Sequence, residues 1–152
     1  MNKILFALAL IILLVSSSNA QQEQTSKDDV LIVKAFLNDI AVPETRADVI
    51  LAKHVQIEKS LTNEEYDYLE ASIDEIRLNL QTKNIETIDY VPFDKLSRRD
   101  KRDIDPEGKP TSKMYFLYYN DRLMLAVYLE NGKIGSFTLV SKGNNLAHFV
   151  TY

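Results

Sequence analysis

The chain has 152 residues, a length typical of one domain, and 45% of them are hydrophobic, 26% charged, 4 are Gly and 4 are Pro. This composition excludes disordered, collagen-like and low-complexity proteins. The formal net charge of −4 argues against a nucleic-acid-binding protein, which needs a basic face.

The N-terminus has the pattern of a removable export signal, residues 1–20. A short positive segment, Met1–Lys3, precedes an uncharged apolar run over Ile4–Val15. Small residues then end at Ala20, which predicts cleavage between Ala20 and Gln21. The apolar run is short for a membrane span, which disfavours the alternative of an uncleaved anchor. We therefore expect no membrane association after cleavage.

The chain has no cysteine, and no Asn stands in an N-x-Ser/Thr glycosylation site. Exported proteins of this size often use disulfides, but the residues left after cleavage can bury a core without them. Thiol nucleophiles and thiolate zinc sites are also excluded. These absences, with the export signal, predict a bacterial periplasmic or secreted protein.

Residues 21–27 are polar without a period and predict a flexible leader, so that a single domain spans residues 28–152. Asp28 and Asp29 are expected to open the first helix, because their charge suits its positive end. An apolar stripe with helical spacing follows, formed by Val33, Phe36, Leu37 and Ile40.

A short second helix is predicted after Pro43, with Thr45 as its cap and apolar residues at 49–51. The weak alternation of His54–Lys59 predicts a short strand.

Thr62 and Glu65 have the spacing of a capping box, in which each side chain accepts the other residue's backbone N–H. The helix behind it carries an apolar stripe at Tyr66, Leu69, Ile73, Ile76 and Leu80. Core packing is the expected role of this stripe, because two heptads are too few to indicate a coiled coil.

After Asn84, the apolar residues recur at every second position, as in a β-strand. Ile85–Phe93 predicts a strand, and Asp94–Lys113 predicts a polar loop. An antiparallel meander is expected after that loop, with strands at Met114–Tyr119, Leu123–Glu130, Lys133–Val140 and Leu146–Thr151.

Asn131 and Gly132 predict a two-residue turn, since a type I′ turn needs a positive φ at both central positions. The register that follows pairs Glu130 with Lys133, Leu129 with Ile134, Ala126 with Phe137, Leu125 with Thr138 and Met124 with Leu139. Both faces of this hairpin are therefore apolar. A pocket under a curved sheet, a homodimer through the sheet, or a helix layer that wraps further around the sheet would each bury the second face.

The helical segments Val33–Ile40 and Ala47–Val55 come first in the chain, and the hairpin Glu130–Ile134 comes late. In order and spacing, these segments resemble the NTF2-like superfamily of the cystatin-like architecture. The resemblance implies an α+β fold in which N-terminal helices pack on a curved C-terminal antiparallel β-sheet around a pocket, often with dimerisation through the sheet. Asp94–Lys113 departs from the compact pattern of that family.

No phosphate-binding or hydrolase motif occurs, and His54 and His148 lack metal-ligand spacing, so we expect no cofactor and no metal. The NTF2-like resemblance implies that an enzyme of this kind would use acid–base groups in an apolar pocket, where burial moves pKa values toward neutrality. The candidates for such groups are Asp89, Tyr90, Tyr118, Tyr128 and His148. A structural role is favoured for each, because tyrosine is common in strands.

The densest run of charge is Arg98–Arg102, which acidic residues surround, so a solvated loop is expected. The alternative is a short R-x-K-R processing site at Arg99–Arg102.

The favoured hypothesis is a small exported, non-catalytic module that binds a small apolar ligand or a protein partner. An acid–base lyase or isomerase with an NTF2-like pocket is the alternative. A second alternative is an envelope protein with a purely structural, associative role.

Overall fold

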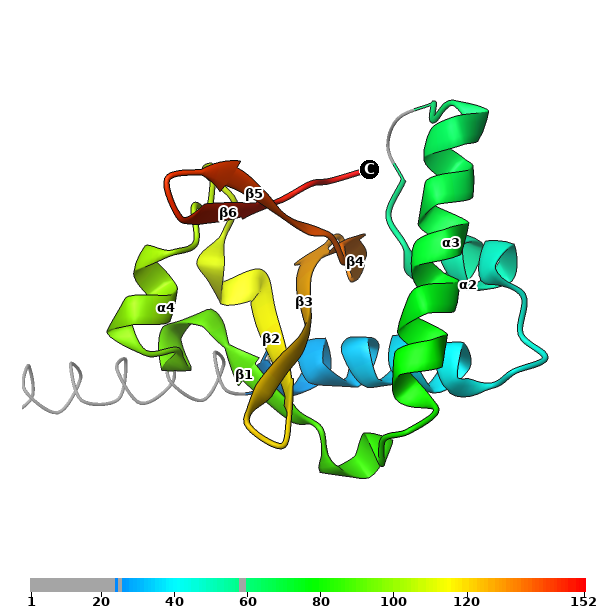
Figure 1. The fold of residues 1–152 in the computed structure, drawn as a ribbon, viewed down its shortest axis with the longest axis horizontal. Helices are drawn as coiled ribbons and strands as arrows, with labels where there is room; N and C mark the ends of the chain where they lie inside the picture. The colour runs from blue at the N-terminus through cyan, green and yellow to red at the C-terminus, as the bar shows by residue number, and fades with distance from the viewer. Residues whose placement is uncertain (1–23, 25, 58–59) are drawn as a thin grey trace, which may run out of the picture.

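The computed structural model describes residues 24, 26–57 and 60–152. Helices from the N-terminal half pack on an antiparallel sheet from the C-terminal half, which confirms the predicted α+β fold class (Figure 1). The export signal and the cleavage site between Ala20 and Gln21 lie outside the described residues. None of the described helices has the length and hydropathy needed to cross a membrane.

The N-terminal helix is described over residues 26–41 and at residue 24. Its predicted stripe of Val33, Phe36, Leu37 and Ile40 is completely buried. The predicted start at Asp28 is too late, because residues 26 and 27 are already helical. Those two residues belong to the predicted flexible leader 21–27, of which residues 21–23 and 25 lie outside the described part of the chain.

The second helix, α2, spans Ala47–His54. Its N-cap is Arg46, whose side chain makes no capping hydrogen bond, so the predicted cap at Thr45 is wrong. The strand predicted to follow is reduced, in its described residues, to an isolated parallel bridge between Val55 and the sheet.

The third helix, α3, spans Asn63–Leu80 and confirms the predicted capping box. The Thr62 N–H donates to Glu65 Oε2 at 2.8 Å, and the Glu65 N–H donates to Thr62 Oγ1 at 3.2 Å. Of the predicted stripe, Leu69, Ile73 and Leu80 are buried, and Tyr66 and Ile76 pack partly buried against the same core.

The main sheet has four antiparallel strands in the order β1-β2-β3-β4. Their bounds are Asp89–Pro92, Met114–Tyr119, Arg122–Glu130 and Lys133–Ser136. Two-residue turns with positive φ join β2 to β3 at Asn120 and Asp121, and β3 to β4 at Asn131 and Gly132. The first strand is shorter than predicted, because Ile85–Thr87 forms a 3-10 turn before it.

A separate two-stranded sheet follows, with β5 at Leu139–Gly143 and β6 at Leu146–Phe149. The predicted strand Lys133–Val140 is therefore wrong beyond residue 136. It breaks because the Phe137 N–H donates at 3.2 Å to the hydroxyl of Tyr152, which also bonds the Thr138 hydroxyl. Tyr152 thus supplies the hydrogen-bond acceptor for Phe137 that a neighbouring strand such as β3 would otherwise have supplied.

The register of the β3–β4 hairpin confirms only the two pairs next to the turn, Glu130 with Lys133 and Leu129 with Ile134. A bulge then pairs Tyr128 with Ser136, so the three outer predicted pairs do not form. These are Ala126 with Phe137, Leu125 with Thr138 and Met124 with Leu139.

Gly135 is the residue that this bulge leaves unpaired, and a Cβ added there would lie 2.9 Å from Glu130 Cβ and 3.1 Å from Tyr128 Cδ1. Gly135→Ala is therefore expected to lower the free energy of unfolding by about 1–3 kcal/mol through overpacking. Urea denaturation measures this change. A loss below about 0.5 kcal/mol, the size usual for surface substitutions, would contradict the close packing of the bulge.

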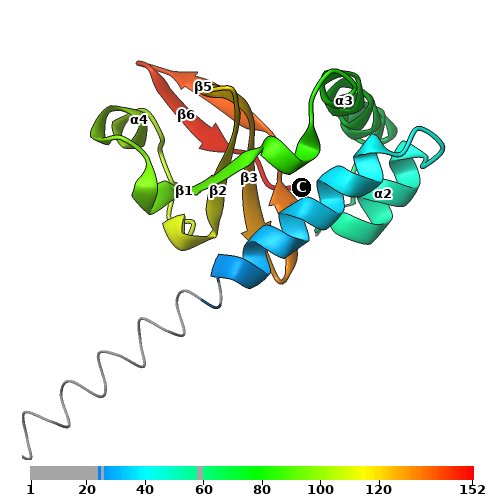
Figure 2. The ribbon, with the colours of Figure 1, turned by 90° about the horizontal axis from the view of Figure 1, so that it is seen from below.

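The two faces of the main sheet have separate covers (Figure 2). The N-terminal helix, α2 and α3 cover one face, whose buried residues are Tyr115, Leu117, Val127 and Leu129. On the other side of the sheet lie the short helix α4 (Arg98–Arg102), the segment around it and the β5–β6 hairpin. The buried sheet residues there are Met114, Phe116, Ala126 and Tyr128.

The segment Asp94–Lys113, predicted to be a solvated polar loop, supplies part of this second cover. Leu96 is buried and Ile104 is half-buried in the same cluster as Phe149. Ile104 also forms a parallel bridge with Ala147 of β6. The second apolar face is thus covered by this chain through loop segments and the β5–β6 hairpin, and not by the wider helix layer that was one of the three expected outcomes.

Candidate functional site

Three of the candidate residues line one open groove along the edge strand β1, with a volume of about 560 Å³. Asp89 and Tyr118 are opposite each other in the register of β1 and β2. Tyr90 contributes to the same groove, but it also packs against the helix-side core. There, Lys34 Nζ lies 5.4 Å from the centre of the Tyr90 ring.

Burial raises the pKa of both tyrosines in this β1 groove. Burial, with a smaller contribution from the Glu86 charge, raises the pKa of Tyr90 to about 12. Burial and the Asp100 charge also raise the pKa of Tyr118. These raised pKa values disfavour the phenolate form of both tyrosines, so neither is suited to act as a general base.

The other two candidates lie elsewhere. Tyr128 belongs to the buried second face of the sheet, where its ring centre lies 6.2 Å from that of Phe149. His148 stands on β6, with Nδ1 2.7 Å from Glu107 Oε2. The predicted acid–base residues are thus not brought together into one catalytic constellation.

Glu107 ties the loop after α4 to the β5–β6 hairpin. Its carboxylate accepts from Lys142 Nζ at 2.9 Å and contacts His148 Nδ1 at 2.7 Å, and Lys109 Nζ lies at 3.6 Å. The hydrogen bonds from Lys142 and His148 lower the pKa of Glu107 to about 2. Lys142 also donates to Asp105 at 2.6 Å, which lowers the pKa of that carboxyl too.

Glu107→Gln is expected to remove a pH-dependent contribution to stability. A carboxylate whose pKa falls from 4.5 when unfolded to about 2 when folded stabilises the folded state above about pH 4.5, and this stabilisation is lost as the pH falls toward 2. Melting temperatures of the wild type and the variant should therefore differ at neutral pH and converge in acid. Glu44→Gln, at an exposed site, should show no such convergence, and an equal pH profile for both variants would contradict the Glu107 contacts.

A second open groove, which sequence reasoning missed, runs between α3 and β3. It consists of a hollow of about 240 Å³ and a hollow of about 600 Å³ that share Asn79 and Met124 as lining residues. We call it the α3–β3 groove. Its apolar lining residues are Ile76, Leu123, Met124, Leu125, Phe137 and Leu139.

The α3 wall of this groove is held in place by Arg77. Its Nε donates to the Ile40 carbonyl at 2.9 Å, at the end of the N-terminal helix, and its guanidinium also bonds the Thr45 carbonyl. Asp74 accepts from the same side chain at 2.6 Å. Arg77 thus ties α3 to the last turn of the N-terminal helix and to the segment before α2.

The spacing of the α3 residues that line the groove was a signal present in the sequence. Tyr68, Ser72, Glu75 and Asn79 follow one another at helical intervals beside the buried stripe. These residues are mostly polar, so they do not stand out in a search for apolar periodicity. The apolar run Leu123–Leu125 was the second signal, because it contains more apolar residues than the covered sheet buries.

Among the described residues, no group of three or more His, Asp or Glu side chains could hold a metal ion. His54 Nε2 instead lies 2.7 Å from Asp39, and its ring stands edge-on to Phe36 at 5.9 Å between ring centres. The hydrogen bonds from His54 and Lys53 lower the pKa of Asp39. This cluster joins the N-terminal helix to α2.

Comparison of the chain with models of protein families, with curated proteins and with solved structures found no match. The resemblance to the NTF2-like superfamily therefore stays a prediction.

Proposed function

We propose that this chain is a non-catalytic binding protein that takes a small apolar ligand in the α3–β3 groove. The observation that carries the proposal is the set of apolar side chains of β3 that line this groove beside α3. Leu123 is 50% exposed, and Met124 and Leu125 are only partly buried. Ligand sites are typically concave and combine an apolar lining with a few placed polar groups. In this groove, polar side chains such as Ser72 and Asn79 of α3 face the apolar residues of β3.

The position of the groove supports a small ligand over a second copy of the chain. The second face of the sheet, which motivated the predicted homodimer, already packs against α4, its flanking segments and the β5–β6 hairpin. The apolar surface left over is concave rather than flat. A hollow of this kind fits a small molecule better than the sheet face of a partner.

The acid–base lyase or isomerase has less support. Asp89 and Tyr118 share the β1 groove, but burial raises the pKa of Tyr118 away from neutrality. Asp89 is solvent-exposed, and Tyr128 and His148 do not line the β1 groove, so the predicted acid–base groups do not share one site. A binding role in the α3–β3 groove requires no such set of groups.

The proposal can be tested by filling the groove from its helical wall. Ser72 lines the smaller hollow, so Ser72→Trp is expected to weaken the binding of Nile red, a neutral apolar dye, by about tenfold or more, which is about 1.4 kcal/mol. Dye fluorescence in a titration with the purified protein measures this binding.

Ala71→Trp provides the matched control, because Ala71 is the preceding residue on α3 and is exposed. The control variant should bind the dye as the wild type does. Wild-type protein that does not bind Nile red, or equal weakening in both variants, would contradict the proposed site.

A further inference from the structure

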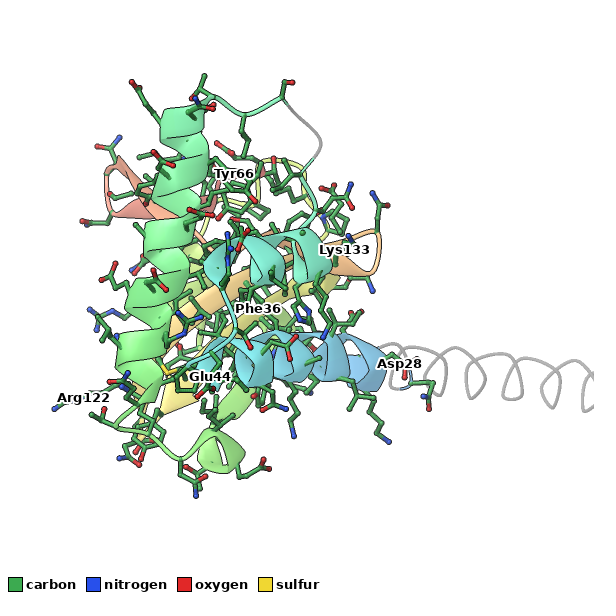
Figure 3. The ribbon with its side chains drawn as sticks, turned by 90° about the vertical axis from the view of Figure 1, so that its right-hand side faces the viewer. Asp28, Phe36, Glu44, Tyr66, Arg122 and Lys133 are labelled. Atoms are coloured by element: carbon green, nitrogen blue, oxygen red, sulfur yellow. The ribbon has the colours of Figure 1, made fainter. Side chains whose placement is uncertain are left out.

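The larger hollow of the α3–β3 groove is lined by two cationic side chains, Lys83 and Arg122. Lys83 follows α3, and Arg122 is the first residue of β3. Figure 3 shows Arg122 beside the C-terminal end of α3. The two basic residues therefore stand at the same end of the groove.

Lys83 is held in a defined position at this end. Its ammonium donates to the carbonyl and to Oδ1 of Asn79, both at 2.6 Å, and lies 5.8 Å from the centre of the Tyr119 ring. An ammonium has three N–H donors, so one remains for a ligand. Lys83 also offsets the negative C-terminal end of α3, which would otherwise repel an anion.

Arg122 offers its whole guanidinium. It is exposed, and within the described part of the chain no carboxylate pairs with it or with Lys83. Glu75 is the one carboxylate among the described lining residues, and it belongs to the smaller hollow. Asp121 lies in the same turn as Arg122 but lines the β1 groove.

The groove is thus basic at one end and apolar along its floor. We propose that its ligand is an amphipathic anion of the long-chain carboxylate class. The alkyl tail lies over Met124 and Leu125 toward the smaller hollow, and the carboxylate is bound by Lys83 and Arg122. This inference rests on the proposed function and adds the charge and the orientation of the ligand.

Competition with bound Nile red tests the charge of the head group. Dodecanoate, dodecanol and dodecylamine carry the same alkyl chain and are used below the concentrations at which they form micelles. Dodecanoate should displace the dye at a concentration about threefold to tenfold lower than either of the others, the size expected of two solvent-exposed ion pairs. High salt should reduce this preference.

The double variant Lys83→Gln/Arg122→Gln should lose the preference for dodecanoate and still bind Nile red, which also shows that it is folded. Arg98→Gln/Arg99→Gln changes the net charge equally on α4, where both side chains are exposed, and should keep the preference.

Equal potency of the three compounds would overturn the inference of an anionic ligand, as would a preference that survives in the Lys83→Gln/Arg122→Gln variant. Either result leaves the proposed function intact, provided that Ser72→Trp still weakens dye binding. Failure of that earlier test would instead remove the proposed function.

Discussion

Phe149→Ala is expected to lower the free energy of unfolding by about 3–5 kcal/mol, the cost of emptying a buried aromatic site. Phe149 is 1% exposed, and its ring centre lies 6.1 Å from that of Phe116 and 6.2 Å from that of Tyr128. These contacts fasten the β5–β6 hairpin to the second face of the sheet. Urea denaturation followed by circular dichroism measures the loss.

Val150→Ala is the matched control, because Val150 is the next residue and is 38% exposed. It should change the free energy of unfolding by less than about 1 kcal/mol. Similar small losses in both variants would contradict the cover of the second face.

Asp29→Asn has the second largest expected effect, a loss of about 2–3 kcal/mol. Asp29 is 5% exposed, and its two carboxylate oxygens each accept from Lys113 Nζ at 2.9 Å. The Tyr115 hydroxyl donates to the same carboxylate at 3.1 Å. An amide oxygen can still accept a hydrogen bond from Lys113, but it carries no charge to balance the ammonium. Because the Lys113 side chain is 33% exposed and regains some hydration, the loss stays below that of a fully buried ion pair.

Asp28→Asn is the control for this substitution. Asp28 is the preceding residue, is exposed and accepts a hydrogen bond at 3.1 Å from Gln24. Thermal or chemical denaturation of both variants should show a loss for Asp29→Asn alone. Equal stability of the two variants would contradict the tie between the N-terminal helix and the start of β2.

The parts of the fold that depend on neighbouring residues follow from the sequence. The stripe beginning at Val33 is buried, the box of Thr62 and Glu65 caps α3, and Asn131 with Gly132 turns the chain between β3 and β4. In each case the interacting groups lie within a few residues, so their spacing determines the local geometry.

Contacts between distant residues account for the main errors. The strand after Lys133 ends because Tyr152 bonds Phe137 and Thr138, and no periodicity within that strand indicates this. Asp29 has the charge expected at a helix end, yet it pairs with Lys113. Pairing across so many residues depends on the tertiary fold.

The candidate site was predicted in part. Sequence reasoning selected Asp89, Tyr90 and Tyr118, which do share a groove, but it placed Tyr128 and His148 with them. It also recognised that β3 carries an excess of apolar residues. It missed the polar wall that α3 adds to the α3–β3 groove. An apolar pattern shows which residues avoid water, and only the fold shows which of them stay open to a ligand.

The most direct measurement of where the ligand binds is a map of backbone amide chemical shifts during titration with dodecanoate. We expect the largest changes in the α3–β3 groove, around Ser72, Ile76 and Asn79 on α3 and around Met124 on β3. The amides of the β1 groove, such as that of Asp89, should stay constant. Changes confined to the β1 groove, or no saturable change at any amide, would contradict binding between α3 and β3.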